Sequence, residues 1–306
     1  GIPAVPQRGE KMRAAALDIG GTSIKSGVWT GVEDKTEEVR ETPTNAGLGG
    51  SYVMEQAVKI LEGYSGYDAI GISTAGQVDS ERGVIRYANE NIPGYTGMEI
   101  RRILEERFSV PVAVENDVNA AAVGEGIFGA GAKENDFLCL TYGTGVGGAI
   151  VMDKKVYHGC AFSAGEFGGL LVHPEERREG EFFSGCYEKY ASTTALVARV
   201  KALDPELSDG RKIFAALKRP QVKAEVDGWI DEIVNGLQTL IHIFNPSCVI
   251  LGGGVMAQPY VTEQVRCRTL DRIMPSFRDV KILPAALGNR AGLLGAAWLG
   301  SRKEEK

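Results

Sequence analysis

The sequence predicts an α/β protein built from two lobes, and three observations lead to this prediction. The chain has 306 residues, whereas single domains usually span about 100 to 200. Runs of strand character alternate with runs of helical periodicity along it, the order typical of α/β proteins. An apolar run, a turn of glycine and threonine, and a second apolar run occur twice, about 125 residues apart, which suggests two related lobes facing a shared cleft.

The elements of the first lobe follow from residue patterns taken in chain order. Residues 14–29 (AAALDIGGTSIKSGVW) predict a β-hairpin around Gly20, Gly21 and Thr22. A flexible joint at 47–51 precedes a helix at 52–62, and residues 69–73 form a buried strand. Residues 99–108 predict an amphipathic helix, 110–114 a strand, and 119–124 a helix of small residues.

The second lobe opens with the second hairpin, at residues 137–151 (FLCLTYGTGVGGAIV). Helices follow around 187–203 and 225–244, and a strand at 248–251 ends in three glycines. A last strand near 280–283 precedes a helix of small residues at 291–299. We place the boundary near residues 118–130, which gives a small N-terminal lobe at 12–119 and a large C-terminal lobe at 120–289.

Composition excludes several classes of protein. A hydrophobic fraction of 43% and a charged fraction of 24% are ordinary for globular chains and exclude disorder and collagen. A net charge of -6 without a basic block argues against a nucleic-acid partner. The five scattered cysteines form no CxxC pair, which favours a reduced, cytoplasmic protein. No apolar run reaches the roughly 20 residues of a membrane span, and residues 1–11 are interpreted as an expression scar or a flexible arm.

Three glycine-rich turns after strands indicate phosphate binding, because backbone without a Cβ atom can approach an anion closely. Residues 143–148 formally match GxGxxG, but a strand follows them where a dinucleotide fold needs a helix. No GxxxxGK[ST] motif occurs, which argues against a P-loop protein. Asp18, at the end of the first strand, is suited to hold hydrated Mg²⁺. The alternative is that these turns are tight hairpins without a ligand.

Asp117 is the candidate for the carboxylate that accepts a hydroxyl proton during phosphoryl transfer. It follows a strand and opens a helix, and Asn116 and Asn119 beside it offer amide hydrogen bonds to a polyol. The alternative is that Asp117 only caps its helix. Glu166 and Glu188 are candidate sugar ligands, and each could instead be a solvated surface acid.

Other residue types suggest no further chemistry. The three histidines, at 158, 173 and 242, have no spacing that indicates a metal or a relay. His242 is expected to be a satisfied helix residue, and Tyr187 and Trp229 are expected to pack in the interior. No GxSxG elbow is present, so acyl transfer finds no support.

Taken in order, four segments resemble the ROK family of sugar kinases and repressors, over nearly the whole chain. They are LDIGGTSIKSGV, VENDVNAAAVGE, LTYGTGVGGAIV and HIFNPSCVILGGGV. The resemblance implies an actin-like/hexokinase (ribonuclease H-like) ATPase fold with a central cleft. It also implies that residues 290–306 pack back on the first lobe, and that the protein forms a homodimer.

The resemblance implies a role for each matching residue. Asp117 would be the general base, and the sugar would be bound by Gly76, Asn91, Asn116, Asp117, Glu166 and Glu188. ATP and its metal would be bound by Asp18, Gly20, Gly21, Thr22, Lys25, Thr141, Gly143, Thr144, Gly145, Gly147, Gly252, Gly253 and Gly254.

The chain departs from the family pattern where the family binds zinc. Its usual ExGH is replaced by Glu166-Phe167-Gly168-Gly169, and Glu179 and Glu181 stand where two cysteines would be. Because Cys186 alone cannot make a four-ligand site, we predict that zinc is absent. Gly169 would leave an opening beside the sugar, which would suit an N-acetyl group or an aglycone.

We therefore expect an ATP- and Mg²⁺-dependent hexose kinase that acts on the 6-hydroxyl of a pyranose, with N-acetylmannosamine, glucose or a β-glucoside as substrate. The donor stays open, because relatives of this fold also use polyphosphate. One alternative is a sugar-binding pseudokinase. Another is a transcriptional regulator that lacks its DNA-binding module. The dozen or so residues before the first strand are too few to form such a module.

Overall fold

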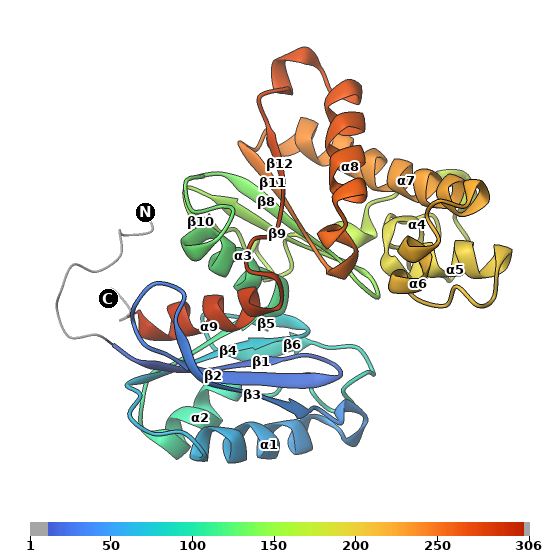
Figure 1. Cartoon of the computed structure of the whole chain (residues 1–306). Helices are drawn as coiled ribbons and strands as arrows, with labels where there is room; N and C mark the ends of the chain where they lie inside the picture. The colour runs from blue at the N-terminus through green and yellow to red at the C-terminus, as the bar shows by residue number, and fades with distance from the viewer. Residues whose placement is uncertain (1–11, 303–306) are drawn as a thin grey trace. The chain divides into compact units, whose positions relative to one another are not determined.

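The computed structural model describes residues 12–302, so the expected arm at 1–11 lies outside the described residues. Two compact units make up the chain (Figure 1). The first contains the chain up to Lys133, Val151–Ala164 and the chain from Asn289 onward; the second contains Glu134–Ile150 and Gly165–Gly288. Within the described residues, no helix is both long enough and apolar enough to cross a membrane.

A five-stranded sheet forms the centre of the first unit, in the order β3-β2-β1-β4-β7. The strands are β1 (Ala14–Ile19), β2 (Ser23–Trp29), β3 (Thr36–Pro43), β4 (Ala69–Thr74) and β7 (Val112–Asn116). β1, β2 and β3 pair antiparallel, while β1–β4 and β4–β7 pair parallel. A small antiparallel ribbon of β5 (Gln77–Asp79) and β6 (Val84–Tyr87) follows β4. The parallel strands β1, β4 and β7 therefore end at the same edge, which is where Asp18 and Asp117 stand.

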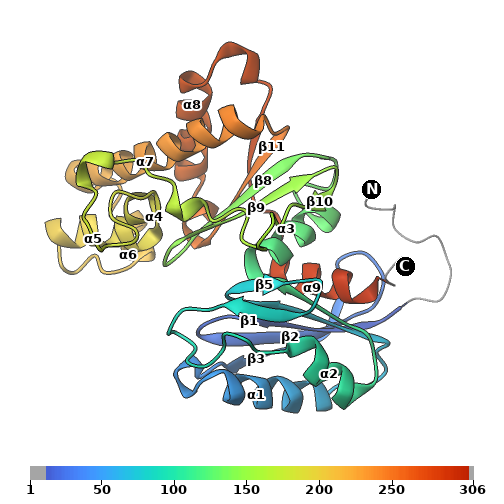
Figure 2. The same cartoon turned by 180° about the vertical axis from the view of Figure 1, so that it is seen from behind.

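Helices cover both faces of this sheet (Figures 1 and 2). α1 (Gly50–Glu62) and α2 (Ile100–Phe108) cover one face, and α3 (Asp117–Phe128) and α9 (Ala291–Ser301) lie on the other. The apolar core between α1, α2 and the sheet includes Leu17, Ile72 and Leu61, each at most 1% exposed. α9 lies so close to β4 that a Cβ atom at Gly71 would overlap the carbonyl group of Ala296.

The units differ from the expected lobes at two places. The first unit extends to Lys133 instead of residue 119, because α3 packs against α9 at glycine contacts such as Gly295 on Ala120. It also takes in Val151–Ala164, which the division at 120–289 assigned to the large lobe. The last helix, α9, belongs to the first unit.

The second unit contains the other sheet, in the order β9-β8-β11-β12. Its strands are β8 (Phe137–Tyr142), β9 (Val146–Met152), β11 (Cys248–Gly252) and β12 (Lys281–Pro284), with β11 parallel to both β8 and β12. The short strand β10 (Lys155–Val156) pairs with the end of β9, within the part of the chain that belongs to the first unit. Both predicted hairpins therefore form.

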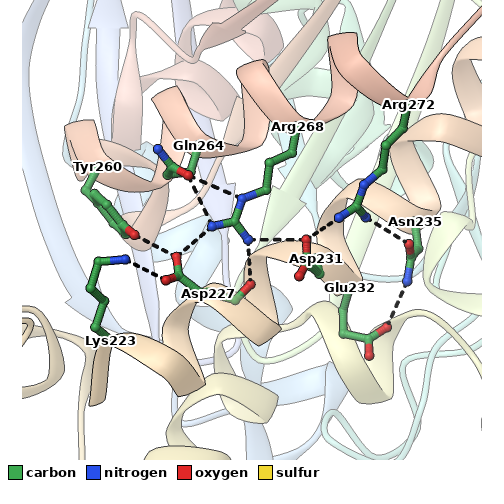
Figure 3. A network of polar contacts seen from close by, with 9 residues as sticks. All are labelled: Lys223, Asp227, Asp231, Glu232, Asn235, Tyr260, Gln264, Arg268 and Arg272. Atoms are coloured by element: carbon green, nitrogen blue, oxygen red, sulfur yellow. Dashed lines mark hydrogen bonds and ion pairs between the residues drawn. The ribbon is translucent and has the colours of Figure 1, made fainter. Parts of the chain in front are cut away.

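The helices of the second unit surround a long central helix. They are α4 (Glu188–Ala191), α5 (Thr193–Leu203), α6 (Gly210–Ala215), α7 (Pro220–Phe244) and α8 (Pro259–Arg272). Tyr187 and Trp229 are fully buried, as the sequence predicted. α7 and α8 are joined by a polar network in which Arg268 contacts both Asp227 (2.7 Å) and Asp231 (3.2 Å) (Figure 3).

Among the differences from the elements expected from the sequence, three have a clear local cause. The helix predicted at 187–203 is broken at Ser192, whose extended backbone ends α4 and whose hydroxyl caps α5. α8 was not predicted, because its buried residues form only the narrow stripe Val261, Val265 and Thr269 in a polar segment. β3 also escaped prediction, since nearly all of its residues are exposed and its pattern is polar.

Candidate active site

The first glycine turn joins β1 to β2 at the edge of the sheet. Its base is held by two hydrogen bonds, from Gly20 N to Ser23 O (3.0 Å) and from Thr44 Oγ1 to Gly20 O (2.6 Å). Gly21 and Thr22 at the tip are exposed, and a Cβ atom at Gly21 would meet nothing within 4 Å among the described residues. A braced base and an open tip suit contact between backbone and a phosphate group.

Asp18 lies at the end of β1, beside this turn. Its Oδ1 accepts a hydrogen bond from Ser73 Oγ (2.7 Å), and Lys25 stands opposite it on β2. Burial raises the pKa of Asp18 above its usual value, although the bond from Ser73 and the charge of Lys25 oppose this. A partly buried carboxylate at the edge of an open phosphate turn fits the single-carboxylate attachment of hydrated Mg²⁺.

Asn116, and not Asp117, is the N-cap of α3. Asn116 Oδ1 accepts hydrogen bonds from Val118 N (2.9 Å) and Asn119 N (3.1 Å), as an N-cap side chain does. Asp117 is the first residue of the helix. The capping role that the sequence left open for Asp117 therefore belongs to its neighbour.

The Asp117 carboxylate is held through one of its two oxygens. Oδ1 accepts from Asn116 Nδ2 and from Val118 N, both at 2.9 Å. Burial, and secondly the negative charge of Asp18, raise the pKa of Asp117 to about 6. A carboxyl group with a pKa in this range is suited to accept a proton near neutral pH.

The amide of Asn116 also joins Gly76 to this group, since Asn116 Nδ2 donates to Gly76 O (2.9 Å). Gly76 has φ of 100°, a backbone conformation that favours glycine. Asn91 is placed differently from these residues. It lies in the exposed loop between β6 and α2, where its N–H donates to Asn89 Oδ1 (3.1 Å).

In the second unit, the structure joins the second hairpin and the three glycines after β11. Thr141 and Gly252 are paired between β8 and β11. Gly253 has φ of 105°, and a Cβ atom there would overlap the carbonyl of Tyr142. The residues brought together here are Thr141, Gly143, Thr144, Gly145, Gly147, Gly252, Gly253 and Gly254. Glycine residues, whose backbone is not covered by a side chain, are thus concentrated at the ends of β8 and β11.

Glu188, at the start of α4, lies against the second hairpin. Its Oε2 accepts from Val146 N (3.1 Å), and a Cβ atom at Gly145 would overlap its carboxylate. Glu166 precedes the 3₁₀ turn Phe167–Gly169 and is an exposed residue. Desolvation of its carboxyl group, and secondly the charge of Glu188, raise the pKa of Glu166. The two acids therefore act on each other, although Glu166 keeps the surface position that the sequence left open for it.

The segment from Gly169 to Cys186 stands where the family pattern has its zinc ligands. A Cβ atom at Gly169 would lie 3.6 Å from Cε1 of Phe183, so an aromatic ring borders the opening expected there. In the described part of the chain, one group of His, Cys and acidic side chains is close enough to share a metal: His173, Glu175 and Glu176. Both imidazole nitrogens of His173 already bond to carboxylates, of Glu175 (3.0 Å) and Glu232 (2.9 Å).

His158 was not predicted to have a partner, and here the structure corrects the sequence analysis. Its Nε2 lies 2.7 Å from Glu115 Oε2, although the two residues are 43 positions apart. Spacing along the chain carries no signal of this pair, because only the fold brings β7 and the segment after β10 together. His242 agrees with expectation, since its Nδ1 bonds to Gln238 O (2.7 Å) on the same helix.

Comparison with known proteins gives consistent matches over nearly the whole chain. A family model described as "ROK family" matches residues 14–303. The β-glucoside kinase of Listeria monocytogenes is 32% identical, over 96% of this chain and 99% of that protein. The structure of the ROK hexokinase from Thermus thermophilus is 34% identical, with a TM-score of 0.80 over 94% of this chain and 98% of that one.

A third similar protein was solved with ligands. The ROK family glucokinase from Streptomyces griseus, in complex with glucose and AMPPNP, is 31% identical. Its TM-score is 0.81, over 94% of this chain and 99% of that chain. The predicted family and fold class are both confirmed by these matches.

Proposed function

This chain belongs to the ROK family, and from that premise we propose that it is an ATP- and Mg²⁺-dependent hexose kinase. The proposed acceptor is the 6-hydroxyl group of glucose or of a β-glucoside. The observation that carries the proposal is the environment of Asp117, a half-buried carboxylate with a pKa raised to about 6 at the edge of a sheet beside Asp18. This is the pairing of base and metal ligand that phosphoryl transfer to an alcohol requires.

Asp117 would take the proton of the sugar hydroxyl during transfer. The hydroxyl oxygen forms a bond to the γ-phosphorus, the bond from that phosphorus to the β–γ bridging oxygen breaks, and ADP leaves. Because Oδ1 of Asp117 is engaged by Asn116 and Val118, the hydroxyl proton goes to Oδ2. Asn116 would orient the base, since its two amide N–H groups bond to Asp117 Oδ1 and Gly76 O.

The phosphates would be held mainly by backbone. The turn at Gly20, Gly21 and Thr22 belongs to the first unit, and the turn at residues 143–147 belongs to the second. Gly252 and Gly253 are packed against Thr141 and Tyr142, where a side chain would crowd them. A Cβ atom at Gly254 would meet nothing within 4 Å among the described residues, so backbone there would leave space for the nucleotide. Bound Mg²⁺, attached to Asp18 through water, would neutralise charge on the transferred phosphoryl group.

Glu166 and Glu188 would accept hydrogen bonds from sugar hydroxyls. Their mutual repulsion, visible in the raised pKa of Glu166, is relieved when hydroxyl groups donate to both. Phe183, 40% exposed and next to Gly169, adds an apolar ring beside these acids. An apolar ring suits the carbon face of a second sugar or an aglycone, which favours β-glucosides, with N-acetylmannosamine as the second candidate.

The experiment is ADP release with ATP and Mg²⁺ over five sugars: glucose, mannose, N-acetylglucosamine, N-acetylmannosamine and a β-glucoside disaccharide. We expect turnover with glucose or the β-glucoside. Asp117→Asn is expected to lower kcat by about 10² or more, because the amide cannot accept the proton. Binding of the sugar by calorimetry is expected to remain.

Asp279→Asn provides the matched control, because Asp279 is an exposed residue of the second unit, outside every turn described above. It is expected to retain full turnover. An Asp117→Asn variant with near-normal kcat would contradict the assignment of the base. Sugar binding by the unaltered protein without any ADP release would instead indicate a sugar-binding pseudokinase.

A further inference from the structure

A buried carboxylate that the proposed reaction does not use lies next to the base in the chain. Glu115 is 4% exposed, at the end of β7. Its Oε2 is 2.7 Å from Nε2 of His158, and the same imidazole nitrogen is 3.3 Å from Ser80 Oγ. Since a buried carboxylate is costly without a partner, the contact with His158 gives Glu115 the partner of opposite charge that its buried position requires.

The second oxygen of Glu115 holds the turn that carries Asp117. Oε1 accepts from the backbone N–H of Asn116 (2.8 Å) and from Asn119 Nδ2 (3.1 Å). Asn119 is itself buried, and its Oδ1 has no hydrogen-bond partner among the described residues. Glu115 is therefore the group that fixes the Asn119 side chain. It bonds to the start of α3 on both sides of Asp117, at Asn116 and at Asn119.

From Asn116 the chain of contacts reaches the base, through the bond from Asn116 Nδ2 to Asp117 Oδ1 (2.9 Å). We propose that His158 is a positioning residue for phosphoryl transfer, which holds Glu115 so that Asn116 and Asp117 keep their places. The inference rests on the proposed function, and it adds a residue that touches neither the sugar nor the phosphates.

The charges around His158 favour its protonated form. Burial lowers the pKa of His158, but the hydrogen bond and charge of Glu115, together with the charge of Glu81, raise it above the ordinary value overall. Glu115 faces it from β7, Glu81 from the turn after β5, and both are acidic. As pH rises through the raised pKa of His158, the positive charge is lost and the buried Glu115 is left uncompensated.

Three variants test the inference: His158→Ala, His158→Gln and, as the matched control, His242→Gln on α7. We expect His158→Ala to lower kcat about tenfold or more, because a small displacement of a catalytic group is costly. The KM for ATP should change by less than about threefold. Glutamine, whose Nε2 can donate from the same place but carries no charge, should restore kcat in part, to the level that the unaltered protein keeps after His158 has deprotonated. The control should equal the unaltered protein.

The dependence of kcat on pH distinguishes positioning from a loss of stability, because a loss of stability alone would not change the shape of this profile. The unaltered protein should lose kcat on the alkaline side as His158 deprotonates, whereas His158→Gln should lack this decline because its amide does not titrate. If His158→Ala folds poorly, a double-mutant cycle of His158→Gln and Glu115→Gln replaces it. Coupling of the two changes supports the inference, and additive effects overturn it.

The failure of this inference is distinguishable from the failure of the proposed function. A His158→Ala variant within about twofold of normal kcat overturns the inference and leaves the kinase intact. If the unaltered protein turns over no sugar, hydrogen exchange over residues 115–119 decides instead. Faster exchange in His158→Ala that is restored in His158→Gln supports positioning, and equal exchange in all three proteins overturns it.

Discussion

At the scale of single residues, the raised pKa of Asp117 affects the stability of the fold. Its pKa is raised to about 6, mainly by burial and secondly by Asp18. Between its unfolded pKa near 3.8 and this value, the folded state binds more protons than the unfolded state. The ionisation of Asp117 at neutral pH therefore lowers the free energy of unfolding. An isosteric amide removes this penalty and can still accept the two hydrogen bonds to Oδ1.

We therefore predict that Asp117→Asn raises the midpoint of thermal unfolding at pH 7 to 8, and that the gain disappears as pH falls below about 4. Differential scanning calorimetry over this pH range is the measurement. Asp204→Asn is the control of opposite sign, since the hydrogen bond from Arg219 lowers the pKa of Asp204 and its removal should cost stability at neutral pH. A stability loss in Asp117→Asn at pH 8 would contradict the origin of the raised pKa.

At the scale of elements, the segment between Gly169 and Tyr187 is tied to its surroundings by hydrogen bonds and ring contacts. Tyr187 N donates to Leu170 O (2.7 Å), and Leu171 pairs with Cys186 as an antiparallel bridge. His173 adds its bond to Glu232 on α7 and packs against Tyr190 in a tilted arrangement, with ring centroids 4.2 Å apart. These contacts tie both ends of the segment to the second unit.

We predict that the purified protein contains no stoichiometric zinc, and that a chelator leaves its melting temperature unchanged, because one cysteine cannot complete a structural site. Elemental analysis and thermal unfolding with and without chelator are the measurements. His173→Ala, which removes the tie to α7, should lower the melting temperature in the same assay. One zinc per chain, lost together with stability on chelation, would show that this segment binds metal after all.

At the scale of the whole molecule, the first unit is discontinuous along the chain. Its sheet is formed before residue 117, yet α9, which covers one face, comes from the last residues. Trp298 on α9 makes an edge contact with Trp29 of β2 and with Phe128 of α3, each with ring centroids 5.9 Å apart. Without α9, the buried face of β1 and β4 would be exposed to water.

We predict that a chain ending at Gly288 does not unfold cooperatively as the full chain does, because it cannot bury this face. Circular dichroism melting and binding of a hydrophobic dye compare it with the full protein, and a chain ending at Arg302 serves as the length control. A sharp, full-length-like transition in the truncated chain would show that the sheet is stable without its final helix.

Much of this protein follows from sequence patterns that act over short distances. The alternation of strands and helices, both hairpins and the glycine turns depend on local propensity, so they could be predicted one segment at a time. The same is true of Asp18 and Asp117, because each stands at the end of an apolar run where a parallel strand exposes its last residue. Resemblance to a family added roles to these positions without adding geometry.

Only the tertiary structure decided which residues act on one another. The contact of Glu188 with the hairpin at Gly145 and the pair of His158 and Glu115 join residues whose relation depends on packing. The position of α9 on the first unit has the same origin, since small residues matter there only where another backbone comes close. Sequence periodicity records which face of an element is buried; which element covers that face is settled by long-range packing, and chain spacing does not encode it.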